Sequence, residues 1–210
     1  MASRRTYGDP CGIARGLDLI GDRWALLIAR ELLLGPKRFT DLRAGLPHVG
    51  PDMLAQRLRE LDQAGVVRRD QLPPPAGARV YELTDWGRGL EPVLLALGRW
   101  GSQAPFPPER GKLGVDALVL ALKTLFDPGR ADGLTGRTFE LQLGASTFAV
   151  RVGETELEVT RGPAAEVTAT LAADPGVLQH ALWHGRDGGL EIQGDRRAAQ
   201  RFLRLFPVSG

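Results

Sequence analysis

The sequence is poor in residue types that mark several common classes of protein. Its 210 residues include a single cysteine, Cys11, which excludes a disulfide framework. It has no signal-peptide pattern and no apolar run long enough to span a membrane. We therefore expect a cytoplasmic protein that does not bind membranes.

Residues for metal binding and catalysis are equally scarce. Of the three histidines, His180 and His184 are four apart on a predicted helix, but no third ligand is evident. No nucleophile–base pair and no phosphate-binding glycine loop is recognisable. The sequence therefore predicts no metal, no cofactor and no enzymatic activity.

Lysine is rare too, because only three of the 27 basic side chains are lysine. The arginine excess fits phosphate or carboxylate recognition, although a GC-rich genome would produce the same bias. The charge is uneven: residues 1–100 carry a net +3 and residues 101–210 a net −1. Since this excess is small, any affinity for nucleic acid must depend on where the cations lie.

The length and the 43% hydrophobic content predict two domains, each with its own core. The segment "GSQAPFPPERG", residues 101–111, is rich in glycine and proline and has no periodicity, so it is the best boundary. We predict one domain over 1–103 and a second over 112–210.

The first domain reads as three helices, a hairpin and a further helix. Apolar periodicity predicts helices over 12–35, 38–46 and 50–65, and short β-type runs at 66–72 and 79–83 predict a hairpin. Thr84 or Asp85 then caps a last helix that is interrupted near Pro92. This is the order of a winged helix-turn-helix, in which the third helix enters the major groove.

The helix over 50–65 has two distinct faces. Leu54, Leu58 and Leu61 form a narrow apolar stripe, which folding explains. The opposite face is polar and consists of Asp52, Gln56, Arg59 and Gln63. That face is either ordinary solvated surface or a surface that reads DNA bases, and we favour the second interpretation.

Residues 11–101 resemble the HxlR-type transcriptional regulators, a branch of the MarR-like winged-helix proteins. The matching segments are "CGIARGLDLIGDRWALLIARELLLGPKRF", "FTDLRAGLPHVGPDMLAQRLRELDQAGVVRR", "YELTDWGRGL" and "LGRWG". The resemblance implies a cytoplasmic homodimer that binds a palindromic operator in double-stranded DNA, most simply as a repressor. Segments that form the dimer interface in this family contain Trp24, Leu97 and Trp100.

The resemblance also assigns DNA contacts. The residues placed to meet base edges are Asp52, Met53, Gln56 and Arg57, with Gln56 suited to adenine and Arg57 to guanine. On this basis, Arg57→Ala should remove most sequence specificity. The expected phosphate contacts are Lys37, Arg38, His48, Arg68, Arg69 and Arg79.

The second domain is predicted to be α+β. A nearly all-apolar helix over 113–126 precedes four short alternating strands, which the recurring glycines make a meander of hairpins. A helix over 175–185, a strand over 189–194 and a helix over 195–207 follow.

This order resembles the sterol-carrier-protein-2-like domain. The resemblance implies an antiparallel sheet covered by helices, with an apolar cavity for a lipid-like small-molecule effector. Possible walls are Leu122, Phe126, Phe148, Leu182 and Trp183, for which plain core packing is the alternative.

Two other functions compete with a ligand-sensing regulator. In the first, the protein is a carrier of lipid-like ligands and its winged helix mediates only protein contacts. In the second, the C-terminal domain is architectural and Cys11 senses oxidants, with Arg15 one turn away favouring the thiolate.

Overall fold

The computed structural model describes residues 6–75, 77–104, 113–185 and 188–207. The chain divides into two compact units, Met1–Leu94 and Leu95–Gly210. This division falls within the helix α6 (Glu91–Gly101). The predicted domains, 1–103 and 112–210, leave a short segment between them. Residues 105–112 lie outside the described residues, so these domain limits stay a prediction.

The first unit begins with four helices, α1 (Gly12–Ile20), α2 (Ala25–Leu32), α3 (Phe39–Gly45) and α4 (Pro51–Gln63). The prediction of one helix over 12–35 was wrong, because a turn at residues 21–24 separates α1 from α2. Trp24 has φ 80°, a left-handed conformation that a right-handed helix cannot include. The two helices also differ in burial, since α2 contributes five buried residues and α1 none.

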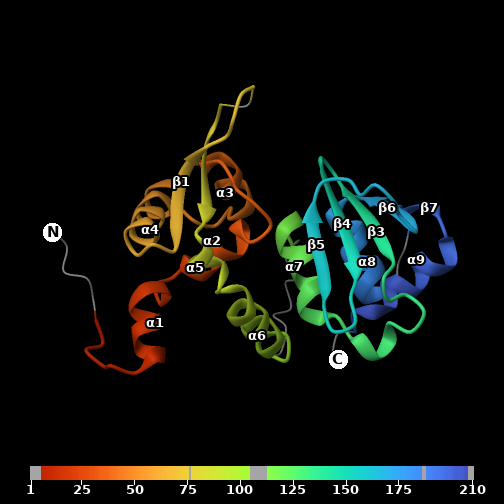
Figure 1. The fold of residues 1–210 in the computed structure, drawn as a ribbon, viewed down its shortest axis with the longest axis horizontal. Coiled ribbons are helices and arrows are strands. Elements are labelled where there is room, and N and C mark those ends of the chain that lie inside the picture. The colour runs from red at the N-terminus through yellow and green to blue at the C-terminus, as the bar shows by residue number, and fades with distance from the viewer. Residues whose placement is uncertain (1–5, 76, 105–112, 186–187, 208–210) are drawn as a thin grey trace. The chain divides into compact units, whose positions relative to one another are not determined.

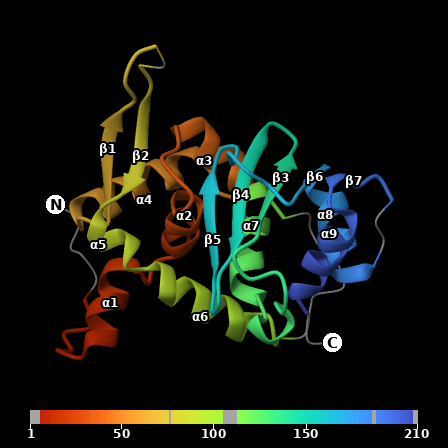
Figure 2. The ribbon, with the colours of Figure 1, turned by 45° about the vertical axis from the view of Figure 1, so that its right-hand side comes forward.

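A β-hairpin, here called the wing, follows α4. It pairs β1 (Val67–Gln71) with β2 (Arg79–Leu83) in antiparallel register, with Arg69 opposite Tyr81. Lys37 extends this sheet, because its backbone N–H and C=O both bond to the backbone of Tyr81, at 2.9 and 2.8 Å. Figures 1 and 2 both show the wing projecting beyond α3 and α4.

The end of the wing and the next helices follow the prediction. The hydroxyl of Thr84 accepts a hydrogen bond of 3.0 Å from the Gly87 N–H and so caps α5 (Asp85–Arg88). The helical segment is interrupted before Pro92, and α6 (Glu91–Gly101) starts afresh. Both the cap and the interruption are confirmed.

The core of the first unit is formed mainly by α2, α3 and α4. Leu54, Leu58 and Leu61 of α4 are at most 1% exposed, as the apolar stripe predicted. Burial of each leucine contributes about 1.5–3 kcal/mol. This face therefore fixes α4 on the core and turns its opposite face to solvent.

Among the described residues, the second unit contains a five-stranded sheet and, beyond the end of α6, three α-helices. The strands are β3 (Thr138–Leu143), β4 (Ser146–Val152), β5 (Leu157–Arg161), β6 (Ala169–Ala173) and β7 (Glu191–Gly194), in the order β5-β4-β3-β6-β7. Helices α7 (Val115–Leu125), α8 (Pro175–His184) and α9 (Arg196–Phe202) pack on one face of the sheet (Figure 1). Two short 3-10 helices, η1 (Pro128–Arg130) and η2 (Leu203–Leu205), complete the unit.

The α+β class is confirmed, but the predicted antiparallel sheet was wrong. Strand β6 pairs in parallel with β3, with Leu141 opposite Leu171, so the sheet is mixed. The link between β5 and β6 carries the chain from the edge strand back to the far side of β3. Alternation in a sequence predicts strands and their faces but not which neighbours they pair with or in which direction.

The largest apolar side chains of the central strands lie on one face of this sheet. Phe139, Leu141 and Phe148 are fully buried, and the ring of Phe139 stacks on that of Phe202 from α9 with centroids 4.4 Å apart.

Among the described residues, none of the helices has both the length and the apolar character that a membrane span requires.

Candidate DNA-binding site

The helix α4 presents a polar, solvent-exposed face. It begins at Gly50 and has Pro51 at its first position, where the missing N–H costs no helical hydrogen bond. The turn from α3 ends at Pro51, and the exposed His48 lies within it. The residues exposed on α4 beyond Pro51 are Asp52, Met53, Gln56, Arg59 and Gln63. This is the geometry of a recognition helix seated on a helical core.

Arg57 does not lie on that exposed face. It is 8% exposed, and its Nη1 donates to Asp22 Oδ2 at 2.5 Å and to Glu60 Oε2. Its Nη2 contacts Met53 Sδ at 3.7 Å. The predicted guanine contact by Arg57 therefore needs correction: in this structure the guanidinium is committed to carboxylates that join α4 to the turn between α1 and α2. The helical spacing placed Arg57 on the flank of α4 but could not show that Asp22 comes near it.

Gln56 is exposed, and its amide is held from one side. Its Nε2 donates to Glu60 Oε1 at 3.0 Å. Glu60 is thus bonded through both carboxylate oxygens, to Gln56 and to Arg57. One N–H and the carbonyl of the Gln56 amide remain available for other contacts.

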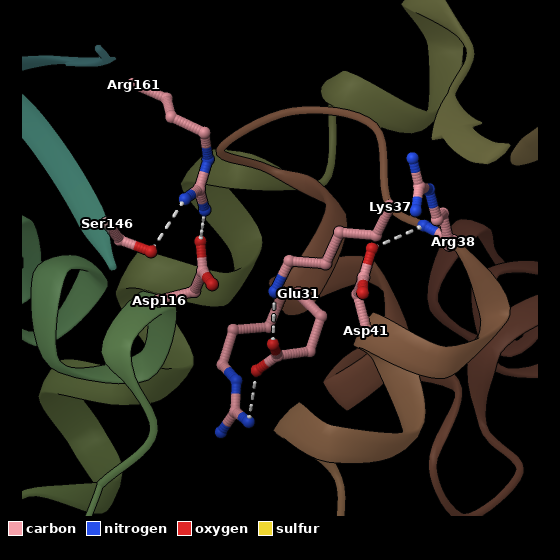
Figure 3. A network of polar contacts seen from close by, with 8 residues as sticks. Glu31, Lys37, Arg38, Asp41, Asp116, Ser146 and Arg161 are labelled. Atoms are coloured by element: carbon pink, nitrogen blue, oxygen red, sulfur yellow. Dashed lines mark hydrogen bonds and ion pairs between the residues drawn. The ribbon is translucent and has the colours of Figure 1, made fainter. Parts of the chain in front are cut away.

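Lys37 and Arg38 have different surroundings although they are adjacent. Lys37 Nζ lies 2.6 Å from Glu31 Oε2, and this carboxylate also accepts from Arg30 Nη2 at 2.8 Å. Glu31 is only 2% exposed, so Lys37 balances a buried charge rather than standing free at the surface. Arg38 is exposed, and its backbone N–H donates to Asp41 Oδ2 at 3.1 Å (Figure 3). Of the two predicted phosphate contacts, only Arg38 presents its side chain to solvent.

The wing carries three exposed arginines, as predicted. Arg68 bonds to Glu82 at 2.7 Å, and this hydrogen bond raises the pKa of the Arg68 guanidinium above its ordinary value. Arg69 pairs with Asp62 at 3.5 Å and lies over the ring of Tyr81. Arg79 sits in the last residue pair of the ladder, opposite Gln71.

Arg59 is a candidate that the predicted DNA contacts omitted. It is exposed and three residues beyond Gln56 on the same helix. The sequence had placed it on the outer face of the helix, and that position was sufficient signal to include it.

Exposed apolar side chains occur on α1 and α6, neither of which buries a residue. On α6, Leu97 is 44% and Trp100 is 72% exposed, so both predicted interface residues are accessible. Trp24 instead packs partly against the core of the first unit. On α1, Ile13 and Leu17 are exposed one turn apart, and sequence reasoning did not single them out.

The predicted ligand-pocket residues separate into two groups. Leu182 and Trp183 line an open pocket of about 440 Å³ formed by α8, α9 and the two 3-10 helices. Leu122, Phe126 and Phe148 do not line it and are at most 8% exposed, so they are core residues in this structure. The pocket also receives Arg130 and Arg204.

Comparison with known proteins finds relatives that match about half of this chain. Residues 19–107 match the family described as "HxlR-like helix-turn-helix". The chain is 37% identical over 89 residues to the HTH-type transcriptional regulator YvaP of Bacillus subtilis (strain 168), which covers 42% of this chain and 82% of YvaP. It is 38% identical over 116 residues to YdeP of the same strain, covering 54% of this chain and 83% of YdeP. A solved structure, the redox regulator HypR in its oxidised form, is 33% identical, covers 46% of this chain and all of its own, and has a TM-score of 0.43.

The fold and the site thus define a DNA-binding transcriptional regulator of the helix-turn-helix class. The chain belongs to the HxlR-like helix-turn-helix family. Its relatives are transcriptional regulators and not enzymes. The family match ends at residue 107, so the sterol-carrier resemblance of the second unit stays a prediction.

Proposed function

We propose that the protein binds an inverted-repeat operator as a cytoplasmic homodimer, with α4 of each protomer in a major groove and each wing on the DNA backbone. The observation that carries this proposal is the exposed polar face of α4, which faces solvent while Leu54, Leu58 and Leu61 anchor the opposite face. A dimer seated across a promoter excludes other proteins from that DNA, so we expect repression.

The DNA contacts divide into base reading and phosphate binding. Gln56 is suited to an adenine edge, which offers one acceptor and one donor. Asp52 and Met53 lie beside it near the start of α4. The exposed side chains suited to phosphates are those of Arg38, His48, Arg59, Arg68, Arg69 and Arg79. We assign Lys37 and Arg57 to holding the domain together, because their side chains are engaged with carboxylates.

Dimerisation is proposed through the exposed apolar faces of α1 and α6. Ile13, Leu17, Val93, Leu97 and Trp100 are between 44% and 76% exposed, which is costly unless a partner covers them. A two-fold dimer would place the two recognition helices about 34–36 Å apart, one turn of DNA.

A direct test combines DNA selection with measurements in salt. The wild-type protein should select inverted repeats from a random-sequence duplex library, and its affinity for them should fall steeply as salt increases. Weak, salt-insensitive and sequence-blind binding would instead favour a carrier whose winged helix serves protein contacts.

The oligomeric state has its own test. Trp100→Asp or Leu97→Asp should convert the dimer to a monomer in analytical ultracentrifugation and weaken operator binding. Thr155→Asp, at an exposed position between β4 and β5 of the second unit, is the matched control and should leave the dimer intact. A dimer that survives all three substitutions would contradict the proposed interface.

For the second unit we propose binding of a small apolar effector, in keeping with the sterol-carrier resemblance. The open pocket of about 440 Å³, where Leu182 and Trp183 lie beside Arg130 and Arg204, is the place we assign to this effector, since ligand pockets commonly measure about 300–1,000 Å³. Native mass spectrometry of gently purified protein should show a retained organic molecule that Leu182→Trp displaces. A clean wild-type mass would count against a filled pocket.

Thiol sensing is a second candidate mode of regulation. Cys11 is exposed and immediately precedes α1, whose exposed apolar face we assign to the dimer interface. Modification there would alter the surface that α1 presents. Treatment with diamide should change operator affinity in the wild type and not in Cys11→Ser; equal responses would exclude this thiol.

A further inference from the structure

We infer that Glu60, held by Arg57, is a positioning residue that fixes the orientation of the Gln56 amide and thereby sets the base preference at the position Gln56 reads. The inference rests on the proposed function, because it requires Gln56 to contact a base. It adds Glu60 and Arg57 to the residues that determine base specificity, although neither of them touches DNA.

The three side chains form a continuous hydrogen-bonded chain along α4. Gln56 Nε2 donates to Glu60 Oε1 at 3.0 Å, and Glu60 Oε2 accepts from Arg57 Nη1. The same Nη1 donates to Asp22 Oδ2 at 2.5 Å, which ties the chain to the turn between α1 and α2. The exposed fraction of the side chain falls along this hydrogen-bonded chain. Gln56 is exposed, Glu60 is 39% exposed and Arg57 is 10% exposed.

The chemistry of Glu60 determines which end of the Gln56 amide can face it. A glutamine amide has a donor end and an acceptor end, and rotation by half a turn exchanges them. An ionised carboxylate only accepts hydrogen bonds, so it attracts the NH₂ end and repels the carbonyl. Glu60 therefore leaves the Gln56 carbonyl and one N–H facing away from it.

This arrangement favours adenine over guanine. Adenine presents an N6 donor and an N7 acceptor in the major groove, which match one carbonyl and one N–H. Guanine presents two acceptors, N7 and O6, and would need both N–H groups of the amide. Because Glu60 already uses one of them, guanine can receive only one hydrogen bond from Gln56.

Arg57 makes Glu60 effective. A pair of exposed side chains four residues apart on a helix is by itself weak and mobile. Here a largely buried guanidinium binds the second carboxylate oxygen, while Met53 and Asp22 contact the guanidinium itself. Arg57 thus restricts the rotamers of Glu60, and its positive charge is shared between Glu60 and Asp22.

The test is a comparison of base discrimination among four variants. The probe is a duplex that the wild-type protein selects from a random-sequence library, with each base pair of one half-site then changed in turn. Affinities are measured by fluorescence anisotropy at one salt concentration for Gln56→Ala, Glu60→Ala, the double variant Gln56→Ala/Glu60→Ala, and Asp62→Ala. Asp62 is the matched control, because it is another carboxylate of α4 but pairs with Arg69 on the wing.

We expect Gln56→Ala to lose discrimination at one base pair by about 5- to 150-fold, the usual contribution of a bidentate contact. Glu60→Ala should lose most of the same discrimination, chiefly by tolerating guanine in place of adenine. Both Glu60→Ala and Asp62→Ala should bind non-target DNA more tightly, since each removes a negative charge. Only Glu60→Ala should change the base preference, and it should have no further effect in the Gln56→Ala background.

The outcomes separate failure of this inference from failure of the proposed function. If Gln56→Ala leaves every position unchanged, Gln56 does not read a base, and the proposed contact itself is wrong. If Gln56→Ala acts as expected but Glu60→Ala behaves like Asp62→Ala, the positioning role is overturned. A uniform loss of affinity for all sequences in Glu60→Ala, with discrimination intact, would show a purely structural role and also overturn it. Glu60→Gln, which keeps the shape, should retain the fold and relax the preference partially, so the inference stays testable if Glu60→Ala does not fold.

Discussion

Arg79 gives the sharpest test of how the wing contacts DNA. It is exposed in the last residue pair of the β1–β2 ladder, and no hydrogen bond or ion pair holds its side chain among the described residues. Arg79→Ala should therefore leave the stability of the protein almost unchanged, as surface substitutions generally do, within about 0.5 kcal/mol. Its effect should appear in the salt dependence of DNA binding.

The magnitude follows from counterion release. Each phosphate contact contributes about 0.9 to the slope of log affinity against log salt concentration. A homodimer has two copies of Arg79, so the slope should become shallower by about 1.8, and by about 0.9 if one wing alone contacts DNA. Between 50 and 200 mM salt, loss of two contacts should reduce the fall in affinity by about 12-fold relative to the wild type, and loss of one by about 3.5-fold.

Fluorescence anisotropy with a selected duplex at four salt concentrations measures this slope. Arg151→Ala is the control, because Arg151 is an exposed arginine of the sheet in the second unit, paired with Glu158 at 3.0 Å. It should give the wild-type slope. An unchanged slope in Arg79→Ala would refute the phosphate contact, and a change equal in both variants would show a non-specific effect of net charge.

Two further predictions concern the fold. Gly87→Ala should destabilise the first unit by about 1–3 kcal/mol, because a Cβ there would lie 2.0 Å from the carbonyl oxygen of Val66 and the backbone would have to shift. Urea unfolding followed by circular dichroism measures this loss of stability. An unchanged free energy of unfolding would contradict the close approach. Asp195→Ala should lower the melting temperature at pH 7, where the native carboxylate accepts a hydrogen bond from the Ala198 N–H that lowers the pKa of Asp195. A carboxyl group whose pKa is lowered in the native state stabilises the protein at pH values above its ordinary pKa of 3.8, and this stabilisation is lost as the pH falls through the native pKa. The difference in melting temperature between wild type and variant should therefore shrink below about pH 3.8. A difference that is the same at pH 3 and pH 7 would exclude the linkage.

Much of the first unit could be predicted because its signals are local. The leucine stripe of α4, proline at its first position and the short hairpin each depend on residues close together in the chain. The Thr84 cap is equally local, since its hydroxyl bonds an N–H three residues away. These features identified the helix-turn-helix and its exposed face without any tertiary information.

One error was local: periodicity continued through residues 12–35, but the left-handed Trp24 separates α1 from α2. The other errors arose where distant residues meet. Arg57 had the correct residue type for reading guanine, but Asp22, 35 residues earlier, comes close enough to bind it. In the second unit, the parallel pairing of β6 with β3 depends on where the β5–β6 link carries the chain, which alternation does not specify.

The sequence by itself determined the elements of this protein, the faces they bury and the family to which its first half belongs, because short-range periodicity and turn chemistry fix these properties. The tertiary structure alone decided which charged groups are free to meet DNA. A carboxylate such as Glu31 or Asp22 withdraws a cation from the surface only when folding brings the two within a few ångströms, and that distance is a property of packing. For this reason our proposal keeps Gln56 as a base contact, adds Arg59 and assigns Arg57 to the fold, although the helix that carries them was recognisable from the sequence.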